Sequence, residues 1–285
     1  MKQYIILLFI VLFLNPLNGQ KKIDLPENKL VHSFVERLPK NLRTLSLKDL
    51  RSSSDSINIR IWQTHTVFTL SYNETVSSEY KIHTSNDNPI VSNTSLPKNI
   101  AQSLLDSLLE CGLMDLHDDK YGGIDGSYVF FELATRDTYK VLSFWSPHAE
   151  RSADCKVVVS ILDIVSRTVD SKKLHAEFFN ALPSGGYRWG MTSIHIDQFL
   201  DKDAVVSDFY LQVEKKVKAE LNITEKTNHW EFPLIYINNK PAMIADINNI
   251  INQEVSSIEV IKPDDELIVL YGTRGSNGVV KIETR

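Results

Sequence analysis

The succession of strand-like and helix-like patterns between residues 57 and 182 constrains the fold of this 285-residue chain more than any other feature. The first three patterns are strand candidates, because apolar and polar side chains alternate over all or part of each one. They cover residues 57–62, 67–72 and 79–84. A helix pattern then begins near Pro97 and ends at Gly112, which are residue types that suit a first helical turn and a helix end.

A hairpin and further helix complete this succession. Residues 128–133 and 138–145 have the composition of strands and are separated by a short polar turn. Residues 156–182 carry a periodic apolar face, which predicts one long helix or two. The resulting order β-β-β-α-β-β-α predicts an α+β fold, in which a mostly antiparallel sheet is covered by helices on one side.

Composition and charge exclude some classes of function. Hydrophobic residues make up 42% of the chain and charged residues 24%, an ordinary globular composition for one or two domains. The formal net charge is −5, and the lysines and arginines are scattered along the chain. Binding of nucleic acid requires a basic patch or stripe, so we expect no nucleic-acid partner.

The N-terminus has the features of a secretory signal peptide. Lys2 supplies a positive charge, an apolar run extends from Tyr4 to Leu14, and Gly19 offers a small residue at the cleavage point. The run is shorter than the roughly 20 residues that a transmembrane helix needs. We therefore predict that residues 1–20 are removed on export and that no membrane-spanning segment remains. The alternative is an uncleaved anchor.

Two cysteines, Cys111 and Cys155, follow the signal peptide. In an oxidising compartment, such a pair can form a disulfide. Both cysteines lie in or at the ends of predicted helices and have apolar neighbours, so two separate buried thiols are the alternative. The sequence leaves both alternatives open.

The loop at residues 115–126 concentrates most of the ionisable groups that could do chemistry. Together with the end of the hairpin, it defines a candidate cleft formed by His117, Asp118, Asp125, Trp145 and His148. Such groups could hold a divalent cation or perform acid–base catalysis. The acids, however, do not have the spacing of a calcium loop, and the glycines favour a solvated connection. We expect no metal and no cofactor.

The common catalytic motifs are absent from the chain, including the Gly-x-Ser-x-Gly, His-Glu-x-x-His and Cys-x-x-Cys patterns. Three glycines near the C-terminus, at positions 272, 275 and 278, precede a strand pattern rather than the helix of a phosphate-binding loop. We predict strands at residues 267–271 and 279–283, joined by a glycine-rich loop. Arg274 would project from this loop toward an acid such as Glu259.

Three segments near the C-terminus occur in an informative order and spacing, namely Pro233–Ile237, Ile258–Lys262 and Leu270–Val280. With these segments, residues 231–285 resemble the plug domain of TonB-dependent outer-membrane receptors. The candidate functional loop of this plug-like module consists of Tyr271, Gly272, Arg274, Gly275, Asn277 and Gly278. Two positions depart from the family: Asn238-Asn239 replaces Asp-Gly at a tight turn, and Pro263–Glu266 replaces an alanine-rich link.

The resemblance implies a compact α/β module in a Gram-negative envelope, located in the periplasm or at the periplasmic face of the outer membrane. In the family, the plug fills a barrel. Too few residues remain here to form one, so we expect no transport by this chain alone. The implied partner is an envelope protein, such as an outer-membrane receptor or a component of the TonB complex.

The sequence thus predicts four segments, with a glycine-containing domain boundary at Pro183–Gly186. These are a signal peptide (1–20), an α+β domain without a recognised function (21–183), a linker with an amphipathic helix (184–230) and the plug-like module (231–285). We interpret the chain as an exported envelope protein that binds another molecule and is not an enzyme. The alternative is a periplasmic hydrolase with a site around His117, Asp118, Asp125 and His148.

Overall fold

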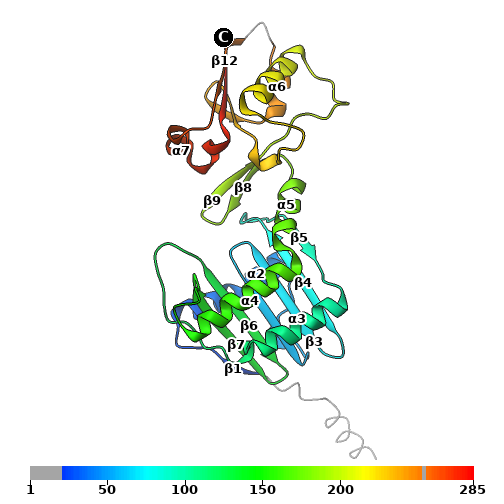
Figure 1. Cartoon of the computed structure of the whole chain (residues 1–285), viewed down its shortest axis with the longest axis vertical. Coiled ribbons are helices and arrows are strands. Elements are labelled where there is room, and N and C mark those ends of the chain that lie inside the picture. The colour runs from blue at the N-terminus through cyan, green and yellow to red at the C-terminus, as the bar shows by residue number, and fades with distance from the viewer. Residues whose placement is uncertain (1–20, 252–254) are drawn as a thin grey trace, which may run out of the picture. The chain divides into compact units, whose positions relative to one another are not determined.

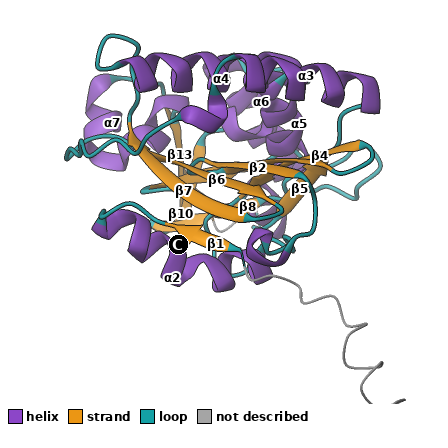
Figure 2. Cartoon of the chain, turned by 90° about the horizontal axis from the view of Figure 1, so that it is seen from below, coloured by secondary structure: helices purple, strands orange, loops and turns teal. Residues whose placement is uncertain are grey.

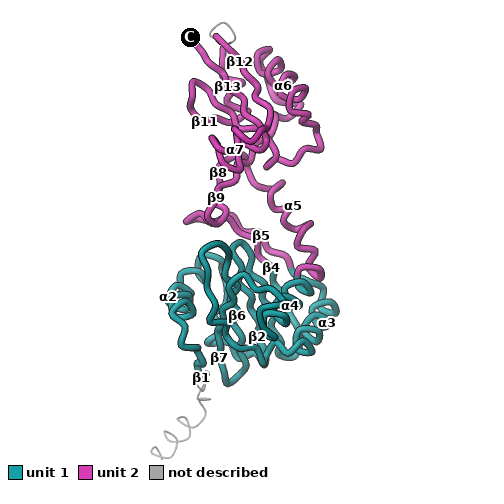
Figure 3. Tube along the Cα trace, turned by 60° about the vertical axis from the view of Figure 1, so that its left-hand side comes forward, with its two compact units in different colours: residues 1–80, 95–165 teal, residues 81–94, 166–285 magenta. Residues whose placement is uncertain are grey.

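The computed structural model describes residues 21–251 and 255–285 (Figure 1). The predicted signal peptide, residues 1–20, lies outside the described residues. Contacts divide the chain into two compact units (Figure 3). The first contains residues 1–80 and 95–165, and the second contains residues 81–94 and 166–285. The mixture of helices and sheets confirms the predicted α+β class.

A seven-stranded sheet has the strand order β1-β7-β6-β2-β3-β4-β5. Its strands are β1 (Lys22–Asp24), β2 (Ile57–Trp62), β3 (Thr66–Tyr72), β4 (Val76–His83), β5 (Val91–Thr94), β6 (Tyr128–Thr135) and β7 (Thr138–Trp145). The pairs β2–β3, β2–β6 and β6–β7 are antiparallel, whereas β1 is parallel to β7. The three predicted strands and the predicted hairpin therefore all form, within a few residues of the expected bounds.

One face of the first unit's sheet is covered by α3 (Lys98–Glu110) and α4 (Ala153–Val169) (Figure 2). Successive side chains of a strand point to opposite faces. On this face the strands present buried apolar side chains, including Ile59, Ile61, Phe131, Leu133, Leu142 and Phe144. The helices complete this apolar layer with residues such as Leu104, Leu108, Val158 and Ile161. Gly112 ends α3 with a φ of +80°, as its position predicted.

The opposite face is covered by α2 (Lys29–Thr44), so the predicted arrangement of helices on one side only is corrected (Figure 2). Phe34 of α2 stacks on Phe130, with ring centroids 4.3 Å apart, and meets the edge of Trp62 at 5.6 Å. The helix forms although Pro39 lies inside it. Packing of an amphipathic face outweighs the cost of one interior proline.

The second unit contains a four-stranded sheet with the order β11-β10-β13-β12. These strands are β10 (Leu234–Ile237), β11 (Lys240–Ala242), β12 (Val255–Ile261) and β13 (Val279–Thr284). Asn238 and Asn239 both have a positive φ, and Ile237 pairs with Lys240. A two-residue turn with this backbone is the common hairpin connection. The two asparagines thus keep a tight turn where the sequence predicted an altered one.

The helix α6 (Asp208–Leu221) packs against this sheet. Its buried side chains Phe209, Val213 and Val217 share one apolar cluster with Ile235 and Val280. Since α6 covers the sheet, residues 231–285 lack part of their own core when taken alone. We use "C-terminal module" below for residues 185–285, which include this helix.

The segment predicted to begin as a linker is a β-hairpin of β8 (Gly185–Trp189) and β9 (Thr192–Ile196). Gly185 and Gly186 pair with Ile196 and His195. Before this hairpin, α5 (Ser171–Ala181) follows α4. The segment predicted as one long helix or two therefore forms two helices. The boundaries between the two units fall at residues 80/81, 94/95 and 165/166 and not at Pro183–Gly186. The contacts between residues set these boundaries, and the position of the glycines does not.

The predicted strand at residues 267–271 is instead the helix α7 (Asp265–Tyr271). The Asp264 side chain caps it by accepting a hydrogen bond of 2.8 Å from the Leu267 backbone N–H. Leu267 is buried, but Val269, which the strand prediction placed in the core, is exposed. Short 3₁₀ helices complete the structure: Leu50–Ser52, Leu113–Asp115, His229–Glu231, Ile244–Asn249 and Gly272–Asn277.

Both cysteines are free thiols, so no disulfide joins them, but only one of the two is buried as the second alternative predicted. Cys155 is buried, with its Sγ 3.6 Å from Oδ2 of Asp119, whereas Cys111 is partly exposed. Among the described residues, no helix combines the length and the apolar character that crossing a bilayer requires.

Candidate functional site

The glycine-rich loop of the C-terminal module is folded tightly back against α7. A Cβ atom on Gly275 would lie 2.3 Å from the carbonyl oxygen of Leu267, which leaves no room for a side chain. Gly278 has a φ of +87°, a conformation that other residues rarely adopt. The 3₁₀ turn Gly272–Asn277 therefore replaces the expected hairpin loop, and it places Arg274 beside β9.

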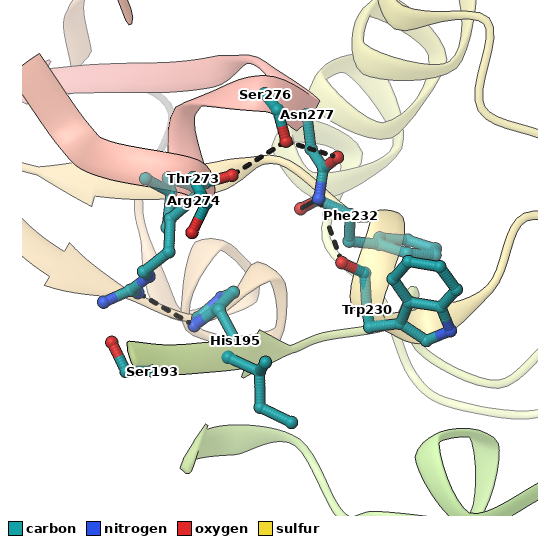
Figure 4. Close-up of a pocket in the computed structure, with 10 residues that line it drawn as sticks. Ser193, His195, Trp230, Phe232, Thr273, Arg274, Ser276 and Asn277 are labelled. Carbon is teal, nitrogen blue, oxygen red and sulfur yellow. Dashed lines mark hydrogen bonds between the residues drawn. The ribbon is translucent and has the colours of Figure 1, made fainter. Parts of the chain in front are cut away.

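Arg274 contacts a histidine rather than an acid. Its Nη2 lies 3.3 Å from Nδ1 of His195 (Figure 4). A guanidinium only donates hydrogen bonds, so Nδ1 of His195 is the acceptor in this contact. The predicted partner Glu259 instead lies opposite Lys281 in the β12–β13 ladder, so this pairing was wrong.

Asp197 stands behind His195, whose Nε2 is buried and has no hydrogen-bond partner among the described residues. Oδ2 of Asp197 is 3.6 Å from Nε2 of His195. The carboxylate is fully buried and accepts backbone hydrogen bonds from Gln198 at 2.9 Å and from Ile244 at 2.7 Å. The three side chains thus form a row, Asp197–His195–Arg274, in which the aspartate faces the core and the arginine faces a cavity.

Asn277 ties the other end of the loop to the segment before β10. Its side-chain nitrogen donates to the carbonyl oxygen of Trp230 at 2.9 Å and to that of Phe232 at 3.4 Å (Figure 4). The hydroxyl of Ser276 donates to the Thr273 carbonyl at 2.8 Å. The loop is therefore held at both ends, by Arg274 and by Asn277.

Between these contacts lies a cavity of about 180 Å³, which we call the Arg274 pocket. It is lined by Ser193, Ile194, His195, Trp230, Phe232, Leu234, Thr273, Arg274, Ser276 and Asn277 (Figure 4). Two residues of the predicted loop, Arg274 and Asn277, line it. The glycines shape the loop, and Tyr271 packs on Tyr236 with ring centroids 5.5 Å apart.

Sequence reasoning missed the other half of this pocket. His195 lies near the end of β9, and Asp197 follows this strand. Trp230 lies in the 3₁₀ turn before β10. All three belong to the segment that was interpreted as a linker and a helix. The available signal was the run Thr192–Ile196, which has the β-branched and alternating character of a short strand.

The second candidate, the predicted cleft in the first unit, is not assembled. His117 is 83% exposed and lies 3.8 Å from Asp154. The carboxylate of Asp118 has a structural role, because it accepts hydrogen bonds from the Ser143 backbone N–H and from the Asn28 side chain, both at 2.7 Å. Asp125 is exposed, as is His148.

Trp145, the fifth member of the cleft, packs against the glycine loop. A Cβ atom on Gly123 would lie 2.4 Å from its indole nitrogen. None of the cavities described here is lined by these five residues. In the described part of the chain, no group of three or more His, Cys, Asp or Glu side chains has an arrangement suited to a metal ion.

A buried polar cluster under α2 has no counterpart in the sequence analysis. Arg60 and Glu132 are almost fully buried and form an ion pair at 3.4 Å. Glu132 also accepts hydrogen bonds from Trp62 Nε1 at 2.5 Å and from the Tyr139 hydroxyl at 2.7 Å. Burial, together with the charge of Glu132, raises the pKa of Tyr139 far above its usual value, so that its hydroxyl stays a donor.

A cavity of about 240 Å³ lies beside Arg60 and is lined mostly by polar side chains. Arg60 does not offer a free group there, because its Nε donates to Thr69 at 3.0 Å and its Nη2 donates to the Lys48 carbonyl at 2.9 Å. The cluster therefore serves the packing of α2 and the segment after it onto the sheet.

Comparison of the chain with known protein families, with curated proteins and with solved structures found no match in any of the three.

Proposed function

We propose that this chain is an exported protein of a Gram-negative envelope that acts by binding a protein partner and not by catalysis. The plug-like part of the C-terminal module makes the contact. The resemblance of residues 231–285 to receptor plugs motivates the location and the class of partner, an outer-membrane receptor or a component of the TonB complex. Transport is not part of the proposal.

The observation that carries this proposal is the apolar surface that α7 exposes, called the α7 face below. Three consecutive side chains, Ile268, Val269 and Leu270, are 42%, 84% and 72% exposed. Apolar side chains that are exposed together, especially with a polar rim, mark contact sites for other proteins. The acids Asp265 and Glu266 precede them in the same helix. A complementary partner therefore presents an apolar surface with lysine or arginine at its margin.

Charges on this face should abolish the contact. We expect the double variant Val269→Asp/Leu270→Asp to capture at least tenfold less receptor or TonB-complex component from envelope fractions than the unmodified protein. Fully burying one such side chain contributes about 1.5–3 kcal/mol, and each 1.4 kcal/mol corresponds to a factor of ten in affinity. Quantitative mass spectrometry of the captured proteins measures the change.

The matched control is Val205→Asp, because Val205 is 94% exposed and belongs to the same unit but not to α7. It should capture as much partner as the unmodified protein. Equal capture by the α7 variant, or capture without any receptor or TonB-complex component, would refute the proposed contact.

Export is tested separately. Mass spectrometry of the protein recovered from the envelope should show an N-terminus near Gln20 or Lys21, because the apolar run ends before a small residue, Gly19. Recovery of chains that still begin at Met1 would contradict cleavage and would support the uncleaved anchor.

A further inference from the structure

We propose that the Arg274 pocket binds a carboxylate that is attached to a small apolar group. The carboxylate would pair with Arg274, and the apolar group would lie against Trp230 and Phe232. The site is separate from the α7 face, so the proposal does not depend on the protein contact described above.

The first support is the incomplete pairing of Arg274. Among the described residues, its guanidinium has one hydrogen-bond partner, Nδ1 of His195. Its Nε is buried and has no acceptor. Buried donors in folded proteins are almost always satisfied, and an orphaned one calls for a missing partner. A carboxylate is the acceptor whose geometry matches a guanidinium best, because both groups are planar and form two parallel hydrogen bonds.

The charge of the pocket also favours an anion. None of its lining residues is acidic, and Arg274 is its one permanently charged side chain. Asp197 balances the charge only indirectly, through His195, whose side chain is nine-tenths buried. The hydroxyls of Ser193 and Thr273 add donors around the same cavity. A single arginine fits a monovalent carboxylate, whereas phosphate sites generally gather several donors and charges.

The walls and the size of the pocket specify the remainder of the ligand. Trp230 and Phe232 line one side, and Leu234 adds a third apolar side chain (Figure 4). An engineered cavity of about 150 Å³ is known to hold a benzene molecule. The Arg274 pocket, at about 180 Å³, therefore has room for one ring or a similar apolar group beside the guanidinium. A free aromatic acid and the C-terminal residue of a peptide share this chemistry.

Calorimetric titration of the purified protein tests the proposal with two matched pairs of probes. The first pair is phenylacetate and phenylacetamide, which have the same shape but differ in charge. The second pair is the peptide Gly-Gly-Phe and its C-terminal amide. We expect each carboxylate to bind at least tenfold more tightly than its amide. A hydrogen bond to a charged group raises the affinity about tenfold to hundredfold. Tighter binding of phenylacetate indicates a free acid, and tighter binding of the peptide indicates a chain terminus. Either order supports the proposal.

The variant Arg274→Gln should lower the affinity for the better carboxylate about tenfold to hundredfold and should abolish its advantage over the amide. Lys240→Gln is the matched control, because it removes one positive charge from an exposed position of β11 and should leave the affinity unchanged. Trp230→Ala should weaken both members of each pair, since the apolar wall serves acid and amide alike.

Three results would overturn the proposal. The first is equal binding of acid and amide, and the second is tighter binding of inorganic phosphate than of either carboxylate. The third is no detectable binding of any carboxylate at a concentration of about 10 mM, which exceeds the dissociation constants of weak ligands about tenfold. The comparison of acids with amides uses the unmodified protein, so it decides the matter even if Arg274→Gln does not fold.

Discussion

Replacing Glu132 by alanine is expected to lower the free energy of unfolding of the first unit by about 3–5 kcal/mol. The variant leaves the guanidinium of Arg60, which is 1% exposed, without its counter-charge. It also removes the acceptor of the Trp62 indole and the Tyr139 hydroxyl. Removing one partner of a buried ion pair is costly because the other charge cannot regain its hydration.

Urea denaturation measures this effect, followed by tryptophan fluorescence, to which Trp62 contributes as one of four tryptophans. Glu74→Ala is the control. Glu74 is an exposed acid between β3 and β4, so its removal should change stability by less than about 0.5 kcal/mol. A double variant, Arg60→Met/Glu132→Leu, should recover the part of the loss that comes from the unpaired charge, because an apolar pair of similar volume needs no counter-charge. The part that comes from the unpaired Trp62 and Tyr139 donors should remain. A loss below about 1 kcal/mol for Glu132→Ala would show that water reaches Arg60.

Replacing Gly278 by valine is expected to destabilise the C-terminal module by about 2–6 kcal/mol. Gly278 has a φ of +87° and a ψ of 173°, a region that is essentially restricted to glycine. A Cβ atom would in addition lie 2.8 Å from the carbonyl oxygen of Ile261 and 2.9 Å from a methyl group of Leu221. Backbone strain and overpacking therefore act at one position, between β12, α6 and the start of β13.

Thermal melting followed by circular dichroism measures this loss. Gly186→Val is the matched control, because a Cβ on Gly186 meets nothing within 4 Å and its φ is not positive. Valine also suits a strand, so this variant should melt close to the unmodified protein. Equal melting temperatures for the two variants would mean that the backbone at Gly278 relaxes into an ordinary conformation, and the tight loop around Arg274 would then be wrong.

The elements that the sequence predicted correctly are those with strong local signals. The strand at residues 57–62 alternates clearly, residues 128–133 have the composition of a strand, and α3 has an apolar stripe with a glycine at its end. The strand at residues 267–271 was wrong because a run of five apolar residues fits a strand and a helix equally well. The cap from Asp264, three residues before Leu267, was the local signal in favour of the helix.

By itself, the sequence determined the α+β class and the strands β2, β3, β4, β6, β7 and β13, because side-chain periodicity acts over a few neighbouring residues. Only the tertiary structure decided that α2 covers the second face of the sheet, that α6 belongs to the C-terminal module, and that Arg274 meets His195. These contacts join residues far apart in the chain, such as Arg274 and His195 across 79 positions. Their formation depends on strand register and on competition among apolar faces for the same core, and neither is encoded in a short window of sequence.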